Sequence, residues 1–263
     1  MNYQHDDKMD YAIIGDSHEC VEELRSLITR LEAEIPGVQI VLVGDTVDKG
    51  NNTEEMIRYL YERHLRNQDV RLRGNHEAFV HGRLEGIIGP MENPEREKEV
   101  FGSQATFLAK PELALMFAAM YDKAYPAFYI YPWDDEGGEH PVFVTHAPCS
   151  KVHLGQIDPA SVRAQRNYRV KDRTVPVAQD LSWFYDEADE NEPLHVFGHM
   201  AHSGKALAEC QYKNKIFLDT GCVYGNGLSA VHIHDGKVAG YYFEPAIRNR
   251  NPHEILPPPL GLR

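Results

Sequence analysis

The chain has 263 residues, of which 42% are hydrophobic and 25% are charged, and its formal net charge is −13. These values are typical of a globular protein with enough apolar residues for a sizeable core. The negative charge argues against general nucleic-acid binding, because the phosphate backbone would repel such a chain.

Neither a membrane span nor a targeting segment is expected. No apolar run approaches the roughly 20 residues that cross a bilayer, and the first ten residues are polar and acidic rather than signal-like. The four cysteines are scattered without a Cys-x-x-Cys pair, which is typical of reduced thiols. We therefore expect a cytoplasmic protein without a membrane partner, and the sequence leaves its oligomeric state open.

The first part of the chain alternates between strand and helix patterns. Apolar, strand-forming runs occupy residues 11–15, 38–44 and 69–73. A helical pattern starting near residue 21 separates the first two, and a second helix opens at a capping box of Asn52 and Glu55. This order predicts a parallel α/β sheet.

The rest of the chain begins with a mainly helical block at 76–125. Strand-like runs then follow at 127–131, 141–146, 194–197, 215–218, 228–234 and 237–243. Because neither a repeat nor a long linker divides the sequence, we expect one domain over residues 1–263, with insertions at about 79–140 and 150–192. The proline-rich tail at about 252–263 is expected on the surface.

Each of the first three predicted strands ends at a glycine followed by polar residues. The segments are "GDSHEC" (15–20), "GDTVDKG" (44–50) and "GNHE" (74–77), and two later strand ends carry His146 and His199. A single Gly-Asp is usually only a turn. Ligands of open α/β sheets, however, bind outside the carboxyl ends of the strands, so five such strand ends indicate one site.

The residues at this edge are carboxylates, imidazoles and one amide. They are Asp16, His18, Asp45, Asp48, Asn75, His76, His146 and His199. Oxygen and nitrogen ligands without thiolate suit Mn, Fe, Zn or Mg. One carboxylate can bridge two such cations, an arrangement that activates water and clamps a phosphate.

The motifs "GDSHECVEELRSL", "GDTVDKG", "RGNHE", "THAP" and "GHMAH", in this order, resemble those of the calcineurin-like metallophosphoesterases. The likeness is strongest to the phosphoprotein-phosphatase branch and its bacterial and phage relatives, which include diadenosine tetraphosphate hydrolases and polynucleotide kinase-phosphatases. It is dense over residues 11–75 and sparse over 141–234. The resemblance implies an α/β sandwich of two mixed β-sheets flanked by helices, with a helical insertion near the active site.

The resemblance also implies a phosphoester hydrolase with two divalent metal ions, Mn first, with Fe, Ni, Zn or Mg as alternatives. The implied metal ligands are Asp16, His18, Asp45, Asn75, His146 and His199. Asp45 would bridge the ions, and a bridging hydroxide would attack phosphorus. His76 would protonate the leaving group as general acid, with Asp48 orienting its imidazole.

Three residues would bind the substrate phosphate by the same resemblance: Asn75, Lys49 and Arg166. The register of the arginine is open, and the alternatives are Arg163, Arg169 and Arg173. Lys49 stands where the family has an arginine, and it keeps the charge but loses the two-pronged geometry. Glu19 replaces a glycine of the family pattern, and we expect it to crowd the rim with negative charge and disfavour highly anionic substrates.

Two other positions near the motifs are not expected to bind metal. Met200 and Ala201 separate His199 from His202, which breaks the Gly-His-x-His spacing of related enzymes. Asp219, within "LDTG", is expected to fix a turn near the site.

The first expectation for the substrate is a phosphoserine or phosphothreonine of a protein. The alternative is a dinucleoside polyphosphate such as diadenosine tetraphosphate, or another nucleotide, because the insertions rather than the metal residues select the substrate. Aromatic residues that could stack on a base are Trp133, Tyr168, Trp183 and Tyr185. A metal-binding scaffold without catalysis is a third hypothesis, which the retained His76 and Asp48 disfavour.

Overall fold

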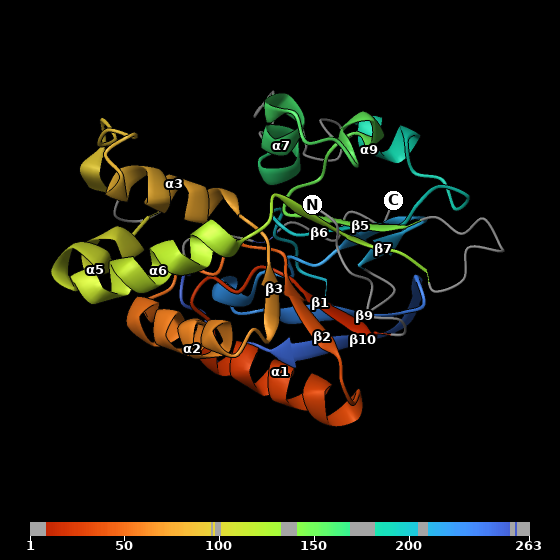
Figure 1. Cartoon of the computed structure of the whole chain (residues 1–263), viewed down its shortest axis with the longest axis horizontal. Coiled ribbons are helices and arrows are strands. Elements are labelled where there is room, and N and C mark those ends of the chain that lie inside the picture. The colour runs from red at the N-terminus through yellow and green to blue at the C-terminus, as the bar shows by residue number, and fades with distance from the viewer. Residues whose placement is uncertain are drawn as a thin grey trace.

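Two stacked β-sheets with helices on their outer faces form the protein in the computed structural model (Figure 1). The structure describes residues 9–95, 97, 101–132, 141–168, 182–204, 210–252 and 256. No helix in these ranges is long and apolar enough to cross a membrane.

The first sheet has five strands in the order β10-β9-β1-β2-β3. They are β1 (Tyr11–Ile14), β2 (Gln39–Leu42), β3 (Asp69–Arg71), β9 (Gly227–His234) and β10 (Lys237–Pro245). β1, β2 and β3 are parallel, as predicted, and α1 (Val21–Glu34) and α2 (Thr53–Leu65) connect them. Ile14 pairs with Leu42, and Leu42 with Arg71, so these three strands end at one edge of the sheet.

The second sheet also has five strands, in the order β4-β5-β6-β8-β7. They are β4 (Ala127–Ile130), β5 (Val142–Thr145), β6 (His195–Phe197), β7 (Gln211–Tyr212) and β8 (Lys215–Phe217). β5, β6 and β8 are parallel, whereas β4 and β7 pair antiparallel. The predicted sandwich of two mixed sheets is confirmed, and among the described strands the two-residue β7 was not expected.

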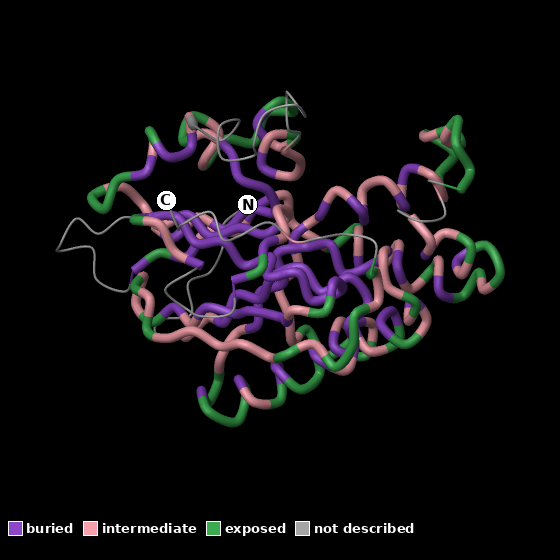
Figure 2. Tube along the Cα trace, turned by 180° about the vertical axis from the view of Figure 1, so that it is seen from behind, coloured by how far each residue is buried: buried purple, intermediate pink, exposed green. Residues whose placement is uncertain are grey.

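The core has one apolar layer between the sheets and one on each outer face. Along β1, Ile13 points to the second sheet, whereas Ala12 and Ile14 point to the helices, as strand alternation requires. On the outer face of the second sheet, Phe184 packs against Phe197. Figure 2 shows buried residues through the centre and exposed ones along the outer helices and turns.

Described helices from the segments of both expected insertions flank the edge where β1–β3 end (Figure 1). α3 (Asn75–Leu84) begins just before the first expected insertion, which then carries α5 (Ser103–Ala109), α6 (Pro111–Lys123) and the strand β4. The second carries the 3₁₀ turn η2 (Lys151–His153), α7 (Pro159–Arg166) and α9 (Ser182–Asp186). A further 3₁₀ turn, η3 (Cys222–Tyr224), precedes β9.

A buried ion pair fastens the segment after β10 to α1. Both terminal nitrogens of Arg250 donate to the Glu23 carboxylate at 2.8 Å, and their side chains are 1% and 0% exposed. Arg250→Met would leave the Glu23 charge buried without its partner, so we expect the free energy of unfolding in urea to fall by about 3–5 kcal/mol.

Arg248→Met is the matched control for this prediction. Arg248 is 52% exposed and pairs with Glu22 at 3.3 Å, so its loss should cost less than about 1 kcal/mol. Equal costs for the two variants would contradict the importance assigned to the Arg250–Glu23 pair.

Candidate active site

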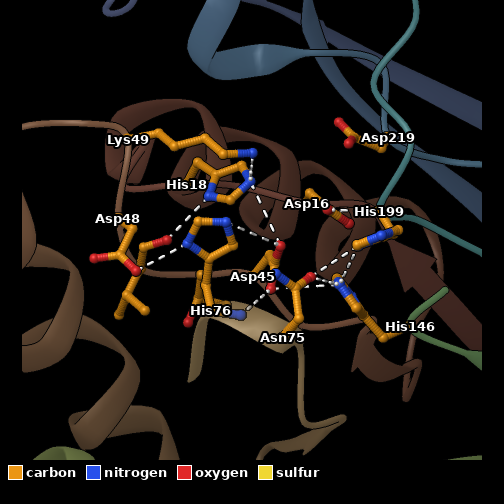
Figure 3. Close-up of polar contacts among 12 residues, drawn as sticks. Asp16, His18, Asp45, Asp48, Lys49, Asn75, His76, His146, His199 and Asp219 are labelled. Atoms are coloured by element: carbon orange, nitrogen blue, oxygen red, sulfur yellow. Dashed lines mark hydrogen bonds and ion pairs between the residues drawn. The ribbon is translucent and has the colours of Figure 1, made fainter. Parts of the chain in front are cut away.

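The predicted site residues converge at the strand ends (Figure 3). Loops after β1 and β2 carry Asp16, His18, Asp45 and Asp48, the first residues of α3 are Asn75 and His76, and the loops after β5 and β6 carry His146 and His199. All of them are buried except Asn75 and His199, which are half-buried. The structure therefore brings together residues from five segments that are far apart in the sequence.

The backbone of these loops is unusual. Five site residues have positive φ: His18 (39°), Asp45 (49°), Asp48 (68°), Lys49 (63°) and His199 (71°). Such conformations cost of order 1–3 kcal/mol each and cluster at functional sites. Two glycines permit the close packing, because a Cβ on Gly74 would lie 2.2 Å from Asp45 Oδ1 and one on Gly198 would lie 1.9 Å from Asp16 Oδ1.

Three histidines of the site share one hydrogen-bonding arrangement. Each donates one ring N–H to a backbone carbonyl: His18 Nδ1 to Val47 at 2.9 Å, His146 Nδ1 to Val43 at 3.0 Å, and His199 Nε2 to Tyr168 at 2.8 Å. The second nitrogen of each ring then faces the site. Metal-binding histidines are held in this way, because the outer hydrogen bond fixes the tautomer and the ring orientation.

One group of donor atoms surrounds Asn75 Oδ1. His146 Nε2 lies 3.0 Å and His199 Nδ1 lies 2.8 Å from it, and the two nitrogens are 3.2 Å apart. Asp45 Oδ1 is 3.4 Å from His146 Nε2. Burial, followed by the charge of His146, lowers the pKa of His199 to about 3, so its imidazole is in the neutral form that binds metals.

A second group shares Asp45. Its Oδ2 lies 3.7 Å from His18 Nε2, and burial, followed by the Lys49 ammonium, holds the pKa of His18 well below its usual value. Burial of Asp45 would raise its pKa, but the charges of His146 and His76 lower it well below the usual range. Asp45 therefore offers an ionised carboxylate to both groups.

Asp16 lies beside the second group, whose donor atoms also include a ring nitrogen of His76 (Figure 3). Its Oδ2 accepts a hydrogen bond from the His199 backbone N–H at 3.0 Å, whereas its Oδ1 is buried without a hydrogen-bond partner among the described residues. Burial, followed by the Asp219 and Asp45 carboxylates, raises the pKa of Asp16 well above its usual value. A buried oxygen surrounded by like charges is stabilised by a cation, so the donor set fits divalent metal ions.

His76 and Asp48 form a pair beside both groups. His76 Nδ1–H donates to Asp48 Oδ2 at 2.9 Å, and His76 Nε2 lies 3.9 Å from Asp45 Oδ2. The backbone N–H of His76 also donates to Asp45 Oδ1 at 3.0 Å. The free ring nitrogen of His76 is thereby held next to the candidate metal ligands.

The cationic residues expected at the phosphate differ in placement. The Lys49 ammonium lies 3.0 Å from His18 Nε2, and although burial opposes its charge, Tyr224 and Asp45 raise its pKa. Arg166 is half-buried at the end of α7, two residues before Tyr168, whereas Arg163 is exposed. Other residues considered from the sequence lie outside the described ranges: Trp133, Arg169 and Arg173.

The expectation that Glu19 crowds the rim of the site with negative charge was wrong. The predicted capping box of Asn52 and Glu55 was wrong as well. Glu19 is 1% exposed and accepts hydrogen bonds from Asp48 N (3.0 Å), Asn52 N (3.0 Å) and Thr53 Oγ1 (2.7 Å). Its φ of 63° explains why a glycine suits this position, and the three hydrogen bonds offset the strain. Glu19 stabilises the Asp48 loop and the start of α2, where Asn52 makes no side-chain cap, and places no charge at the rim.

Glu77 is a second buried acid whose contribution the sequence did not reveal. Its carboxylate accepts hydrogen bonds from Asp45 N (2.9 Å), Thr46 N (2.6 Å) and Thr46 Oγ1 (2.8 Å). It thus fixes the loop that carries Asp45. The only signal was the acid in "GNHE", which an ordinary first helical turn would also favour.

His202 and Asp219, which the sequence did not predict as ligands, both make hydrogen bonds to the backbone. His202 Nδ1 accepts a hydrogen bond from Gly204 N at 3.1 Å, and its Nε2 lies 3.3 Å from the Phe217 carbonyl oxygen. Asp219 Oδ1 accepts a hydrogen bond from Gly221 N at 3.2 Å within its turn.

The described residues contain two further groups of metal-capable side chains, one before β1 and along β9 and one at the start of α1. Asp10 Oδ1 accepts from His232 and His234 at 2.7 Å, before β1 and along β9. The other group is Cys20, Glu23 and Cys222, where Arg250 already neutralises the carboxylate.

Comparison with known proteins identifies the family of the chain. Residues 9–235 match the family model described as calcineurin-like phosphoesterase. Two similar proteins are named bis(5'-nucleosyl)-tetraphosphatase PrpE [asymmetrical]. The protein from Halalkalibacterium halodurans is 23% identical, with 85% of this chain and 89% of the relative covered. The protein from Bacillus mycoides is 27% identical, with 85% and 90% covered.

Solved structures of low sequence identity share the fold. A putative diadenosine tetraphosphatase superposes with a TM-score of 0.54 at 20% identity, over 92% of this chain and 96% of that protein. A metallophosphoesterase from Sphaerobacter thermophilus gives a TM-score of 0.50 at 15% identity, over 91% and 89%. Because the family match at residues 9–235 includes all the loops of the site, the chain belongs to the calcineurin-like phosphoesterase family and is a phosphoric ester hydrolase.

Proposed function

We propose that the chain hydrolyses dinucleoside polyphosphates by asymmetrical cleavage, which releases a nucleoside triphosphate and a nucleoside monophosphate from a tetraphosphate. This proposal rests on the names of the relatives, whose sequences match this chain along nearly their whole length. A protein phosphatase, the first expectation from the sequence, has no comparable support. The burial of Glu19 also removes the expected obstacle to a highly anionic substrate.

Aromatic side chains on both sides of the site support a nucleotide substrate. Phe79 and Phe101 are stacked, with ring centroids 3.7 Å apart, and Phe101 lies 5.1 Å from the His76 ring. On the other side, Tyr168 lies 6.0 Å from Trp183 and its carbonyl binds His199. These aromatic residues are half-buried, and base stacking on such side chains is tolerant of the base.

The metal roles follow from the two groups of donors. Asp16, His18 and Asp45 would hold one divalent cation, and the second would bind to four residues: Asp45, Asn75, His146 and His199. Mn²⁺ is the first choice, and Fe, Ni, Zn and Mg also accept such ligands. When bound, the cations supply Lewis acidity that makes water more acidic and neutralises phosphate charge.

The remaining residues of the site orient the substrate and move one proton. A water oxygen forms a bond to the outer phosphorus while that water loses a proton to solvent, and the bond from that phosphorus to its bridging oxygen breaks; solvent later returns a proton to His76. His76 Nε2 donates a proton to the departing oxygen as general acid, and Asp48 holds the ring by its Nδ1–H. Asn75, Lys49 and Arg166 would bind the phosphate oxygens.

A matched substrate panel tests this proposal. With Mn²⁺, we compare diadenosine tetraphosphate, a phosphoserine peptide, p-nitrophenyl phosphate and a 3′-phosphorylated oligonucleotide. We expect kcat/KM for the dinucleotide to exceed that for the peptide by about 100-fold or more, with ATP and AMP in equal amounts. Preference for the peptide would support a protein phosphatase, and two ADP molecules per substrate would exclude asymmetrical cleavage.

A further inference from the structure

Segment 101–103, in the insertion between β3 and β4, contacts the His76–Asp48 pair although no motif marks it. Ser103 is the first residue of α5 and is 1% exposed. Its backbone N–H donates to Asp48 Oδ1 at 3.1 Å, and its hydroxyl donates to the same oxygen. Phe101 covers the His76 ring at 5.1 Å.

The two oxygens of the Asp48 carboxylate thus have separate partners. Oδ1 accepts two hydrogen bonds from Ser103, whereas Oδ2 accepts the Nδ1–H of His76 at 2.9 Å. The Asp48 backbone is fixed independently, because its N–H donates to Glu19 Oε1 at 3.0 Å. Rotation of the carboxylate about its last bond is intrinsically broad, so Ser103 determines the direction in which Oδ2 points.

We propose that Ser103 is a positioning residue for the reaction: it locks the Asp48 carboxylate so that His76 keeps the orientation needed to protonate the leaving oxygen. This inference rests on the proposed function. Through Ser103, the insertion between β3 and β4 contacts the residue that orients the proton donor. Insertions of this kind differ between enzymes that act on different substrates. α5 packs against α3, which carries His76, and against α6, so the position of the whole helical block affects the pair.

The kinetic test uses Ser103→Ala in the wild-type and His76→Ala backgrounds, with diadenosine tetraphosphate and Mn²⁺. In the wild-type background, we expect kcat to fall by about tenfold, as for other residues that orient a catalytic group, with little change in KM. In the His76→Ala background, Ser103→Ala should add less than about a twofold loss, because coupled residues are not additive. Ser103→Thr should restore most of kcat, and Thr106→Ala, on the same helix, should leave it unchanged.

A full additional loss in the His76→Ala background, a change confined to KM, or no loss at all would overturn the inference. Ser103→Cys, which keeps the volume but donates only weakly, decides the question if the alanine variant does not fold. An intermediate loss of kcat supports the role of the hydroxyl, and wild-type kcat contradicts it.

A spectroscopic readout separates this inference from the proposed function. The His76 Nδ1–H should give a downfield proton resonance, assigned by its absence in His76→Ala. We expect it to move upfield in Ser103→Ala but not in Thr106→Ala. An inactive wild type would refute the proposed function alone, whereas an unmoved resonance would refute the role of Ser103 alone.

Discussion

Asp45→Asn is expected to abolish high-affinity metal binding and to lower kcat/KM by at least about a thousandfold. Asp45 is the one carboxylate that belongs to both groups of candidate ligands, with Oδ1 3.4 Å from His146 Nε2 and Oδ2 3.7 Å from His18 Nε2. Asparagine keeps the shape but loses the charge and one acceptor oxygen. Metal ions contribute several kcal/mol to transition-state stabilisation, and each 1.36 kcal/mol is about tenfold in rate.

Bound Mn²⁺ after equilibrium dialysis and kcat/KM on diadenosine tetraphosphate measure this effect together. Asp122→Asn is the matched control, because Asp122 is an exposed carboxylate near the end of α6. We expect the control to match the wild type in both measurements. Unchanged metal content in Asp45→Asn would show that these residues do not form the metal site.

His76→Ala is expected to lower kcat by about 10²–10³-fold while metal content stays at the wild-type value. The imidazole is held by Asp48 at 2.9 Å, and its ring faces the His18 ring at 4.9 Å. Because the Nδ1 of His76 is bound to Asp48, its Nε2 points into the site and is available for proton transfer. Positioned general acids contribute about 10²–10⁴-fold.

His81→Ala provides the control for His76 on the same helix. His81 stacks on Tyr121 at 4.1 Å rather than on a site residue, and we expect its kcat to stay close to that of the wild type. A loss of bound metal in His76→Ala would instead make His76 a ligand, and unchanged kcat in that variant would exclude it as the acid.

The fold and the convergence of the site residues were predictable because strand ends are strongly encoded. The glycine-polar motifs after β1, β2 and β3 follow directly from short apolar runs, and parallel pairing brings their ends to one edge. His146 and His199 follow β5 and β6 of the second sheet in the same way. At these positions the sequence pattern of an apolar run followed by polar residues predicts both the strand and the place of its end in the sheet.

The contributions of Glu19 and Ser103 were not predictable. The first depends on the direction in which the Glu19 side chain points, and the second on packing between helices that are far apart in the sequence. Glu19 has a left-handed backbone, with φ of 63°, that turns its side chain into the protein instead of toward the rim. Ser103 contacts Asp48, 55 residues away in the sequence, because α5 packs against α2, α3 and α6. Neither contact leaves a periodic signal in the sequence.

The sequence motifs also could not predict whether the substrate is a nucleotide or a phosphoprotein. By the proposed function, Asp45, His76 and their neighbours would act on the reacting phosphate alone, and the helical insertions would contact the rest of the substrate. The ring contacts of Phe79 with Phe101 and of Tyr168 with Trp183 depend on how the insertions fold beside the site, so the sequence alone did not predict them.

The most direct test of the account titrates metal-stripped protein with Mn²⁺ while following both bound ions and diadenosine tetraphosphate hydrolysis. We expect no hydrolysis without metal, and activity that rises with binding to a maximum at two ions per chain. Metal binding without hydrolysis of this substrate or any other in the panel would contradict this expectation and would leave a metal-binding scaffold as the explanation.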